Sequence, residues 1–368
     1  MMHRLISPLM WIGLSSLTVH AQSLDYRITD VVRLEPTTVK DQCMTGTCWS
    51  YSTTSFIESE LQRTTGQNID LSEMYNARMT YLKKAEMYLR LHGLHQFGPG
   101  SLCHDVLSVI SAHGVVPEAH YSGLTDGSGE HDHGDLDALL LAMVETAKAE
   151  RIPVNDPAWL RALNGVLDAY LGPVPEAFEV DGQTFTPETY RDHLALDLGQ
   201  YKSLTSFAHH PYGSPFILEV PDNFSRQAFD NVPLADLQSA VLSALDKGYT
   251  VAWDADVSEP GFSFREGLAV LLPPEMESLK DASGQIAEPP VTEASRQAGF
   301  DNLSTTDDHL MHIIGYAHDQ DGDTFLIVKN SWGDGNLHGG FQYVSIPYFQ
   351  AKTISILLNE NGLPRGMR

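Results

Sequence analysis

The stretch that decides the fold is Lys40 to Leu61, KDQCMTGTCWSYSTTSFIESEL. After Gly46 the apolar residues recur at helical spacing, and Gly66 then supplies a stop, so the pattern predicts a helix that begins at or next to Cys48. Unpaired amide N–H groups and the helix dipole at such an N-terminus favour an anion. A thiolate is an anion of this kind, and a thiol with a lowered pKa is the nucleophile of cysteine enzymes. Cys48 is therefore the candidate nucleophile, although most lone cysteines are inert core residues.

A glutamine stands shortly before this cysteine. Gln42 precedes Cys48 by six residues, one short loop away from the predicted helix. A side-chain amide can donate a hydrogen bond to the oxyanion that forms when a thiolate attacks a carbonyl group. Gln42 is therefore the candidate oxyanion donor.

A histidine and an asparagine far downstream could complete such a site. His309 opens a strand predicted at about 309–317, and Asn330 closes the next predicted strand, 324–330. Adjacent antiparallel strands would bring these two ends together. An imidazole can take and return the thiol proton, and an asparagine oxygen can fix the tautomer of that imidazole. The following Trp332 could shield their hydrogen bond from water.

His312 is the alternative base. It lies three positions along the same predicted strand from His309, so the two side chains point to opposite faces. Only one of them can face the cysteine, and periodicity alone gives little to choose between them.

Charge and the N-terminal segment set the class of protein. The 368-residue chain carries a formal net charge of −25, which makes nucleic acid and anionic membrane surfaces poor partners. An apolar run from Leu5 to Val19, followed by Val19-His20-Ala21, predicts a cleaved signal peptide at 1–21 and export to the periplasm or outside the cell. The run is too short to span a membrane comfortably.

The cysteine count fits an exported protein with a working thiol. Of the three cysteines, Cys48 is the candidate nucleophile, which leaves Cys43 and Cys103 as a possible disulfide.

The rest of the chain divides by composition. We expect a helical lobe at 22–120, a helical insertion at 121–200 and a β-rich lobe at 201–368. Further helices are predicted at 71–91, 102–112, 135–150, 157–171, 187–197 and 234–247, and further strands at 215–220, 249–257, 340–346 and 353–358. The segment 258–300, rich in Pro, Glu and Ser, is expected to be mainly loop.

Two segments contain residues that could bind metals. The acidic loop 122–135 holds His131 and His133, but such loops are usually solvated. The segment 319–323 has some features of a calcium loop, yet its glycine is misplaced, and Asp321-Gly322 between two strands favours a hairpin turn. We therefore expect no metal and no cofactor.

Three motifs, QCMTGTCWS, DDHLMHIIGY and VKNSWGDG, resemble those of the papain-like cysteine peptidases. The resemblance implies a two-lobed α+β fold that binds an extended peptide between its lobes. It implies that Gln42 is the oxyanion donor, Cys48 the nucleophile, His309 the base and Asn330 its orienter. It favours His309 over His312, because His309 follows an aspartate and stands six residues before a Gly-Tyr pair.

Other segments are most similar to the bleomycin hydrolase and aminopeptidase C branch of that family. They are TGTCWSYSTTSFIESEL, LSEMYNARMTYLKKAEMYLRL and VPDNFSRQAF. This similarity implies a helical insertion and removal of residues from peptide N-termini. The segment NENGLPRGMR differs from the C-terminal arm that limits those enzymes to N-termini, so endopeptidase action is an alternative and the oligomeric state stays open.

Two other classes are less compatible with these motifs. A catalytically inactive binding module on the same fold would usually lack the cysteine, the histidine or the asparagine. A transglutaminase-like acyl transferase would normally pair its histidine with aspartate.

Overall fold

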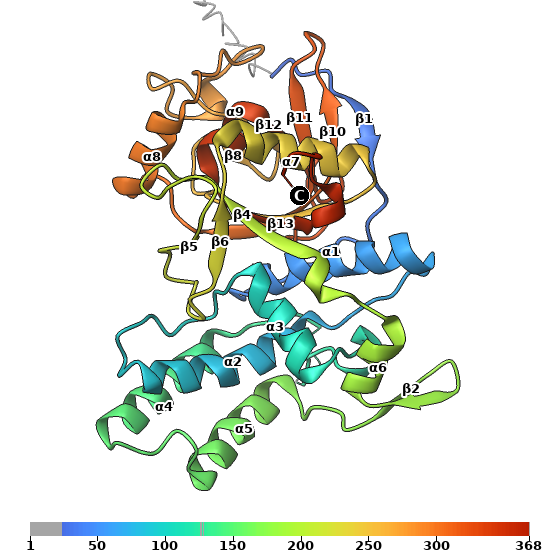
Figure 1. Ribbon diagram of the computed structural model, residues 1–368, viewed down its shortest axis with the longest axis vertical. Helices are drawn as coiled ribbons and strands as arrows, with labels where there is room; N and C mark the ends of the chain where they lie inside the picture. The colour runs from blue at the N-terminus through green and yellow to red at the C-terminus, as the bar shows by residue number, and fades with distance from the viewer. Residues whose placement is uncertain (1–23, 126, 128, 368) are drawn as a thin grey trace, which may run out of the picture.

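The computed structural model describes residues 24–125, 127 and 129–367, so the predicted signal peptide at 1–21 lies outside the described residues. The chain forms two lobes (Figure 1). Helices α2 to α6 occupy one lobe, and nearly all strands occupy the other together with α7, α8 and α9. The predicted two-lobed α+β architecture is confirmed.

The first lobe is built from six helices. Their bounds are α1 (Cys48–Thr65), α2 (Glu73–Arg90), α3 (Cys103–His113), α4 (Gly134–Ala149), α5 (Pro157–Leu171) and α6 (Pro187–Leu194), with the 3-10 turns η1 (Glu118–His120) and η2 (Leu198–Gln200). Local signals set their ends. Gly66 ends α1 in the left-handed conformation, and the Ser72 hydroxyl caps α2 by accepting the Tyr75 N–H.

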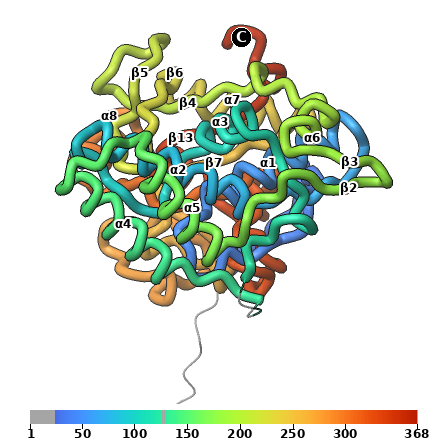
Figure 2. Tube along the Cα trace, turned by 90° about the horizontal axis from the view of Figure 1, so that it is seen from below, coloured from blue at the N-terminus to red at the C-terminus, as the bar shows by residue number. Residues whose placement is uncertain are grey.

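A short hairpin of β2 (Phe178–Val180) and β3 (Gln183–Phe185) also belongs to this lobe. Figure 2 shows it projecting at one edge beside α6. Within the described ranges, none of the helices has the length and apolar composition needed to span a membrane.

The second lobe contains one sheet. Its order is β5-β6-β4-β13-β7-β10-β11-β12-β9-β8, and β1 also pairs with β10. The strands are β1 (Thr29–Arg33), β4 (Tyr201–Thr205), β5 (Pro215–Ile217), β6 (Ala228–Asn231), β7 (Val251–Ala255), β8 (Phe262–Ser263), β9 (Leu268–Ala269), β10 (His309–His318), β11 (Thr324–Lys329), β12 (Phe341–Ser345) and β13 (Thr353–Asn359). Most neighbours are antiparallel, but β4–β6 and β9–β12 are parallel.

The central strands separate two cores. Side chains on one face of β7, β10 and β13, such as Leu310, join the core of the helical lobe that contains α1. Their neighbours on the other face, such as Met311, join a core with α7 (Leu234–Asp246) and α9 (Ile346–Lys352). This alternation follows from the period of a strand. The sheet is therefore buried on both faces, and α1 lies directly against β10.

Some expectations are corrected by the structure. The segment 258–300 is mainly loop, as expected, but the short strands β8 and β9, the 3-10 turn η3 (Leu279–Asp281) and helix α8 (Glu293–Asp301), which begins in it, were not predicted. Helix α8 has no apolar stripe to reveal it. Its Arg296 is buried instead and donates hydrogen bonds to backbone carbonyls of Ser206, Gln350 and Thr353. Strands β1, β4 and β6 were also not predicted.

The suggested Cys43–Cys103 disulfide is wrong. All three cysteines are described, and all three are free thiols. Cys103 lies buried on α3 with its thiol against Thr53, whereas the half-exposed Cys43 contacts the backbone of Asp41. The hairpin turn at 319–323 is confirmed, because β10 and β11 pair on either side of it.

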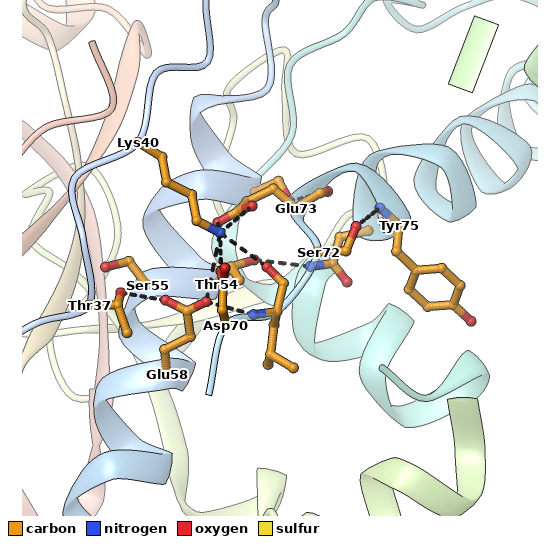
Figure 3. Close-up of polar contacts among 12 residues, drawn as sticks. Thr37, Lys40, Thr54, Ser55, Glu58, Asp70, Ser72, Glu73 and Tyr75 are labelled. Carbon is orange, nitrogen blue, oxygen red and sulfur yellow. Dashed lines mark hydrogen bonds and ion pairs between the residues drawn. The ribbon is translucent and has the colours of Figure 1, made fainter. Parts of the chain in front are cut away.

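A buried network of charges joins the segment before α1 to both lobes (Figure 3). The Lys40 Nζ lies 2.8 Å from Glu73 Oε1 on α2, 2.6 Å from Asp70 Oδ1 and 3.9 Å from Glu58 Oε1 on α1. Burial alone would lower the pKa of Lys40, but the carboxylates of Glu73 and Glu58 outweigh it and raise that pKa. Burial raises the pKa of Glu73 to about 8 although Lys40 opposes this effect.

The network reaches the sheet through a second lysine. Glu58 accepts a hydrogen bond from Thr37 at 2.5 Å, and Lys329 Nζ at the end of β11 donates to the same Thr37 hydroxyl at 3.1 Å. Lys329 also donates to Ser55 on α1 at 2.9 Å. Burial lowers the pKa of Lys329 to about 8. The two lysines thus hold helix α1 between α2 and the sheet.

We predict that Lys40→Met lowers the free energy of unfolding by about 3–5 kcal/mol, because it leaves two buried carboxylates without their cation. Lys83→Met is the matched control, since Lys83 pairs with Glu86 at the surface and should change stability by at most about 1 kcal/mol. Urea unfolding of both variants measures the difference. Equal effects would show that the buried network does not support the fold.

Candidate active site

Cys48 is the first residue of α1, and only 8% of it is exposed. Its N-cap residue, Thr47, makes no capping hydrogen bond through its side chain, while its carbonyl accepts the Ser50 N–H at 2.9 Å. The amide N–H groups of the first residues, Cys48 and Trp49, have no acceptor inside the helix. Together with the helix dipole they favour a negatively charged oxygen or sulfur near Cys48.

His309 and Asn330 are held together on the neighbouring sheet. His309 Nε2 lies 2.8 Å from Asn330 Oδ1, and Trp332 stacks on the imidazole with ring centroids 4.5 Å apart. Asn330 is itself fixed, because its Nδ2 donates to Gln342 Oε1 at 2.6 Å and its Oδ1 accepts the Ser331 N–H at 2.7 Å. This arrangement leaves Nδ1 of His309 as the nitrogen that can exchange a proton.

The nucleophile helix meets the histidine strand directly. The Leu310 N–H, next to His309, donates a hydrogen bond to the Cys48 thiol. One turn further along α1, the Ser52 hydroxyl donates to Met311 O at 2.6 Å. The thiol and the imidazole therefore come from two lobes but belong to one contact between α1 and β10.

Gln42 lies on a strand-like segment that pairs with the Asn330 loop. Its backbone N–H donates to Ser331 O at 2.9 Å, and its side-chain oxygen accepts the Ser331 hydroxyl at 2.7 Å. Its Nε2 donates to Thr45 O at 2.8 Å. Among the described residues no second acceptor contacts this amide, so its other N–H can serve a substrate oxygen.

His312 is packed elsewhere. It is buried under α1, with Nδ1 2.9 Å from the Ser55 hydroxyl and its ring edge against Phe56. The structure thus brings Asn330 to His309 and gives His312 a role in packing.

The electrostatics differ from the expectation that the helix N-terminus lowers the pKa of the thiol. Burial raises the pKa of Cys48 to about 12, and three carboxylates add to this effect although the Leu310 amide opposes it. Burial also lowers the pKa of His309 to about 4, against the hydrogen bond to Asn330 and the charge of Asp308. In the ligand-free site, the neutral thiol and the neutral imidazole are therefore favoured.

The three carboxylates that act on Cys48 were not singled out from the sequence. Asp254 lies on β7 directly opposite Leu310, and Asp307 stands two residues before His309. A hydrogen bond joins these two carboxyl groups, and burial raises the pKa of Asp254 to about 7. They therefore share a proton near neutral pH. An acid within an otherwise apolar strand is the signal that could have identified Asp254.

Asp222 is the third of these acids, and it stands on the loop after β5. It lies so close to Gly100 that a Cβ added there would be 1.9 Å from Asp222 Oδ2. Burial raises the pKa of Asp222, although the nearby Lys84 ammonium lowers it. Together the three acids create a negative potential beside the nucleophile.

The described residues of the two segments considered for metal binding, 122–135 and 319–323, form no cluster of metal ligands. Among the described residues, the one group of His, Cys, Asp and Glu side chains close enough to hold an ion is His209, His210 and Glu219. It belongs to the edge of the sheet and not to the site around Cys48.

Comparison with known proteins gives consistent matches. The Peptidase C1-like family matches residues 175–368, and the family described as papain family cysteine protease matches residues 20–77. Aminopeptidase W of Lactobacillus delbrueckii subsp. lactis is 22% identical over 374 residues, covering 90% of this chain and 83% of that protein. Aminopeptidase C of the same organism is 22% identical over 391 residues, covering 94% and 84%.

A solved structure shares the fold. The crystal structure of PepW from Lactobacillus rhamnosis superimposes with a TM-score of 0.70 at 18% identity, covering 91% of this chain and 83% of that one. The papain-like architecture therefore extends over nearly the whole chain, including the helices between the two family matches.

We predict that Asp222→Asn speeds alkylation of Cys48 by iodoacetamide at pH 7. Loss of a nearby negative charge lowers the pKa of the thiol and increases its thiolate fraction. Mass spectrometry of the Cys48 peptide over time measures the rate separately from that of Cys43. Asp192→Asn, an exposed acid on α6 paired with Arg191, should leave the rate unchanged. A slower rate in Asp222→Asn would contradict this account of the site.

Proposed function

The chain belongs to the Peptidase C1-like family, and we propose that this papain-like cysteine peptidase hydrolyses peptide bonds through Cys48, His309 and Asn330. The proposal rests on the hydrogen bond of 2.8 Å between His309 Nε2 and Asn330 Oδ1. The residue after His309 on β10, Leu310, donates its backbone N–H to the Cys48 thiol. A nucleophile, a base and a group that fixes the base are the parts that acyl transfer requires.

The proposed mechanism starts from the neutral pair. His309 takes the thiol proton as the Cys48 sulfur attacks the scissile carbonyl carbon. The oxyanion that forms accepts hydrogen bonds from the Gln42 side chain and the Cys48 backbone N–H. The C–N bond then breaks, and His309 gives its proton to the leaving amine. Water activated by His309 hydrolyses the thioester and restores the thiol.

We further propose that the substrate carries a free N-terminus. Two relatives are named aminopeptidases, and the three acids near Cys48 favour a cation such as the α-ammonium group of a peptide. A cation bound there would offset the acids and lower the pKa of the Cys48 thiol. Binding of the substrate would then promote attack by the Cys48 sulfur on that substrate.

Endopeptidase action remains the second candidate because of where residues 359–363 lie. Ser243 on α7 and Lys247 just after it donate hydrogen bonds to Gly362 O at 2.8 and 3.1 Å. Asn359 Nδ2 donates to Glu60 Oε2 on α1 at 2.7 Å, about three helical turns after Cys48. The contacts of residues 359–363 therefore lie away from Cys48, and other groups, such as Asp222, would have to supply a restriction to N-termini.

Export is part of the proposal and rests on the sequence pattern of residues 1–21. A free thiol as nucleophile requires that Cys48 stays reduced after export.

We predict that Cys48→Ala abolishes hydrolysis and that Gln42→Glu lowers kcat on the order of 10²–10³-fold, because a carboxylate cannot donate to the oxyanion. Gln42→Glu keeps an acceptor for the Ser331 hydroxyl but loses the hydrogen bond to Thr45 O, so circular dichroism of the variant establishes that it is folded. Gln67→Ala, at an exposed position just after α1, is the control and should be fully active. Steady-state kinetics on a fluorogenic peptide measure these effects, and a kcat of Gln42→Glu near that of the control would remove Gln42 from the mechanism.

A pair of fluorogenic dipeptides with and without a blocked α-amine distinguishes the two activities. We predict turnover of the free-amine substrate and little turnover of the blocked one, with Asp222→Asn raising KM for the free-amine substrate more than for the blocked one. Equal turnover of both substrates would establish an endopeptidase. No turnover of either would favour an inactive binding module.

A further inference from the structure

A cluster of metal-binding side chains lies at the edge of the sheet, outside the site around Cys48. His209 and His210 stand on the loop after β4, and Glu219 follows β5. His209 Nε2 is 3.1 Å from Glu219 Oε2, and His210 Nε2 is 2.8 Å from Glu219 Oε1. From these contacts we propose that His209, His210 and Glu219 form a binding site for a divalent transition metal of the Zn²⁺ type.

The ligand set and its spacing fit such an ion. Imidazole nitrogen and carboxylate oxygen are ordinary ligands of zinc, and two histidines with one glutamate leave a fourth position for water. The three ligand atoms lie within 4.8 Å of one another. A tetrahedral ion with bonds of about 2.0–2.2 Å needs ligand atoms roughly 3.3 Å apart, so small rotations of the side chains would seat it.

The loop that carries the histidines is rigid. The buried Asn231 side chain accepts the Phe207 N–H at 2.9 Å and donates to Phe207 O at 2.9 Å and to His210 O at 3.0 Å. Asn231 lies at the end of β6, which pairs with the strand leading to Glu219. Both histidines and the glutamate are therefore fixed to the same small part of the sheet.

The surroundings also orient the imidazole rings. His210 stacks on Phe216 with ring centroids 4.2 Å apart, and His209 stacks on Phe300 at 5.7 Å. Gln297 also contacts this ring, with its Nε2 3.1 Å from His209 Nδ1, while its Oε1 accepts the Ala208 and His209 N–H groups at 2.6 and 3.2 Å. Binding of a metal ion at His209 Nε2 would displace the proton that this nitrogen shares with Glu219.

The cluster is accessible. The side chains of His209, His210 and Glu219 are 30%, 34% and 53% exposed, so an ion can reach them from solvent.

A bound ion would also affect the neighbouring loop. Glu219 is three residues before Asp222, which lies against Gly100 near the nucleophile. A bound metal would thus connect the loop that contains Glu219 and Asp222 to the loop that carries His209 and His210. Its role would be to fix the position of Asp222 and not to take part in the cleavage of the peptide bond.

Titration of the metal-free chain with Zn²⁺ and Co²⁺ tests the proposal, with isothermal calorimetry for Zn²⁺ and visible absorbance for Co²⁺. The Cys48→Ala background removes the nucleophile thiol as a competing ligand. We expect one equivalent to bind, with a Co²⁺ spectrum typical of tetrahedral nitrogen and oxygen ligands. His210→Gln and Glu219→Gln should each weaken the binding of that one equivalent of metal by at least about 100-fold, because each removes a ligand atom.

His193→Gln is the matched control, because His193 lies on α6 outside the cluster and should leave binding unchanged. Circular dichroism of each variant without metal establishes that it is folded. Binding of equal strength in His210→Gln, Glu219→Gln and His193→Gln would overturn the proposal, as would no binding to the unmodified cluster at millimolar Zn²⁺. Either outcome would leave the histidine–glutamate contacts as hydrogen bonds between loops, without bearing on the proposed peptidase activity.

Discussion

The ion network of Lys40 and Lys329 is the constraint on which the site depends. Lys40 stands two residues before Gln42, and Lys329 directly precedes Asn330. Lys40 pairs with Glu73 on α2 and lies 3.9 Å from Glu58 on α1, and Lys329 donates to Ser55 on α1, so each lysine holds a short segment that carries one of the candidate site residues. The backbone also links these segments, because Gly333 N donates to Lys40 O at 3.2 Å. Charges that must be paired thereby hold Gln42, helix α1 and strand β10 at fixed distances from one another.

The site itself is buried, and burial controls its chemistry. The pKa of the Cys48 thiol is raised and that of the His309 imidazole is lowered, both chiefly by loss of water. Three nearby acids oppose the thiolate further. A peptide that brings its own positive charge would relieve that opposition. The proposed preference for a free N-terminus and the proposed activation of the Cys48 thiol therefore have one electrostatic cause.

Local patterns in the sequence predicted most of the helices and the central strands. The helix at Cys48, the hairpin of β10 and β11 and the helices of the first lobe follow from periodicity and capping residues such as Ser72. The elements that the sequence did not predict share one physical reason. Helix α8 and the short strands β1, β4 and β6 are stabilised by distant partners, as when Arg296 binds carbonyl groups of three separate segments. The disulfide was inferred from a cysteine count, which carries no information on distance.

The sequence by itself determined the residue types of the site, their order and the helix that begins at Cys48, because these follow from local spacing and motif. Only the tertiary structure decided which histidine meets Asn330, since the two faces of β10 contact different surroundings. It also decided the direction of the pKa shifts, because burial depends on the packing of both lobes. The three acids near Cys48, and the cluster of His209, His210 and Glu219, come from strands and loops that approach one another only when the sheet forms.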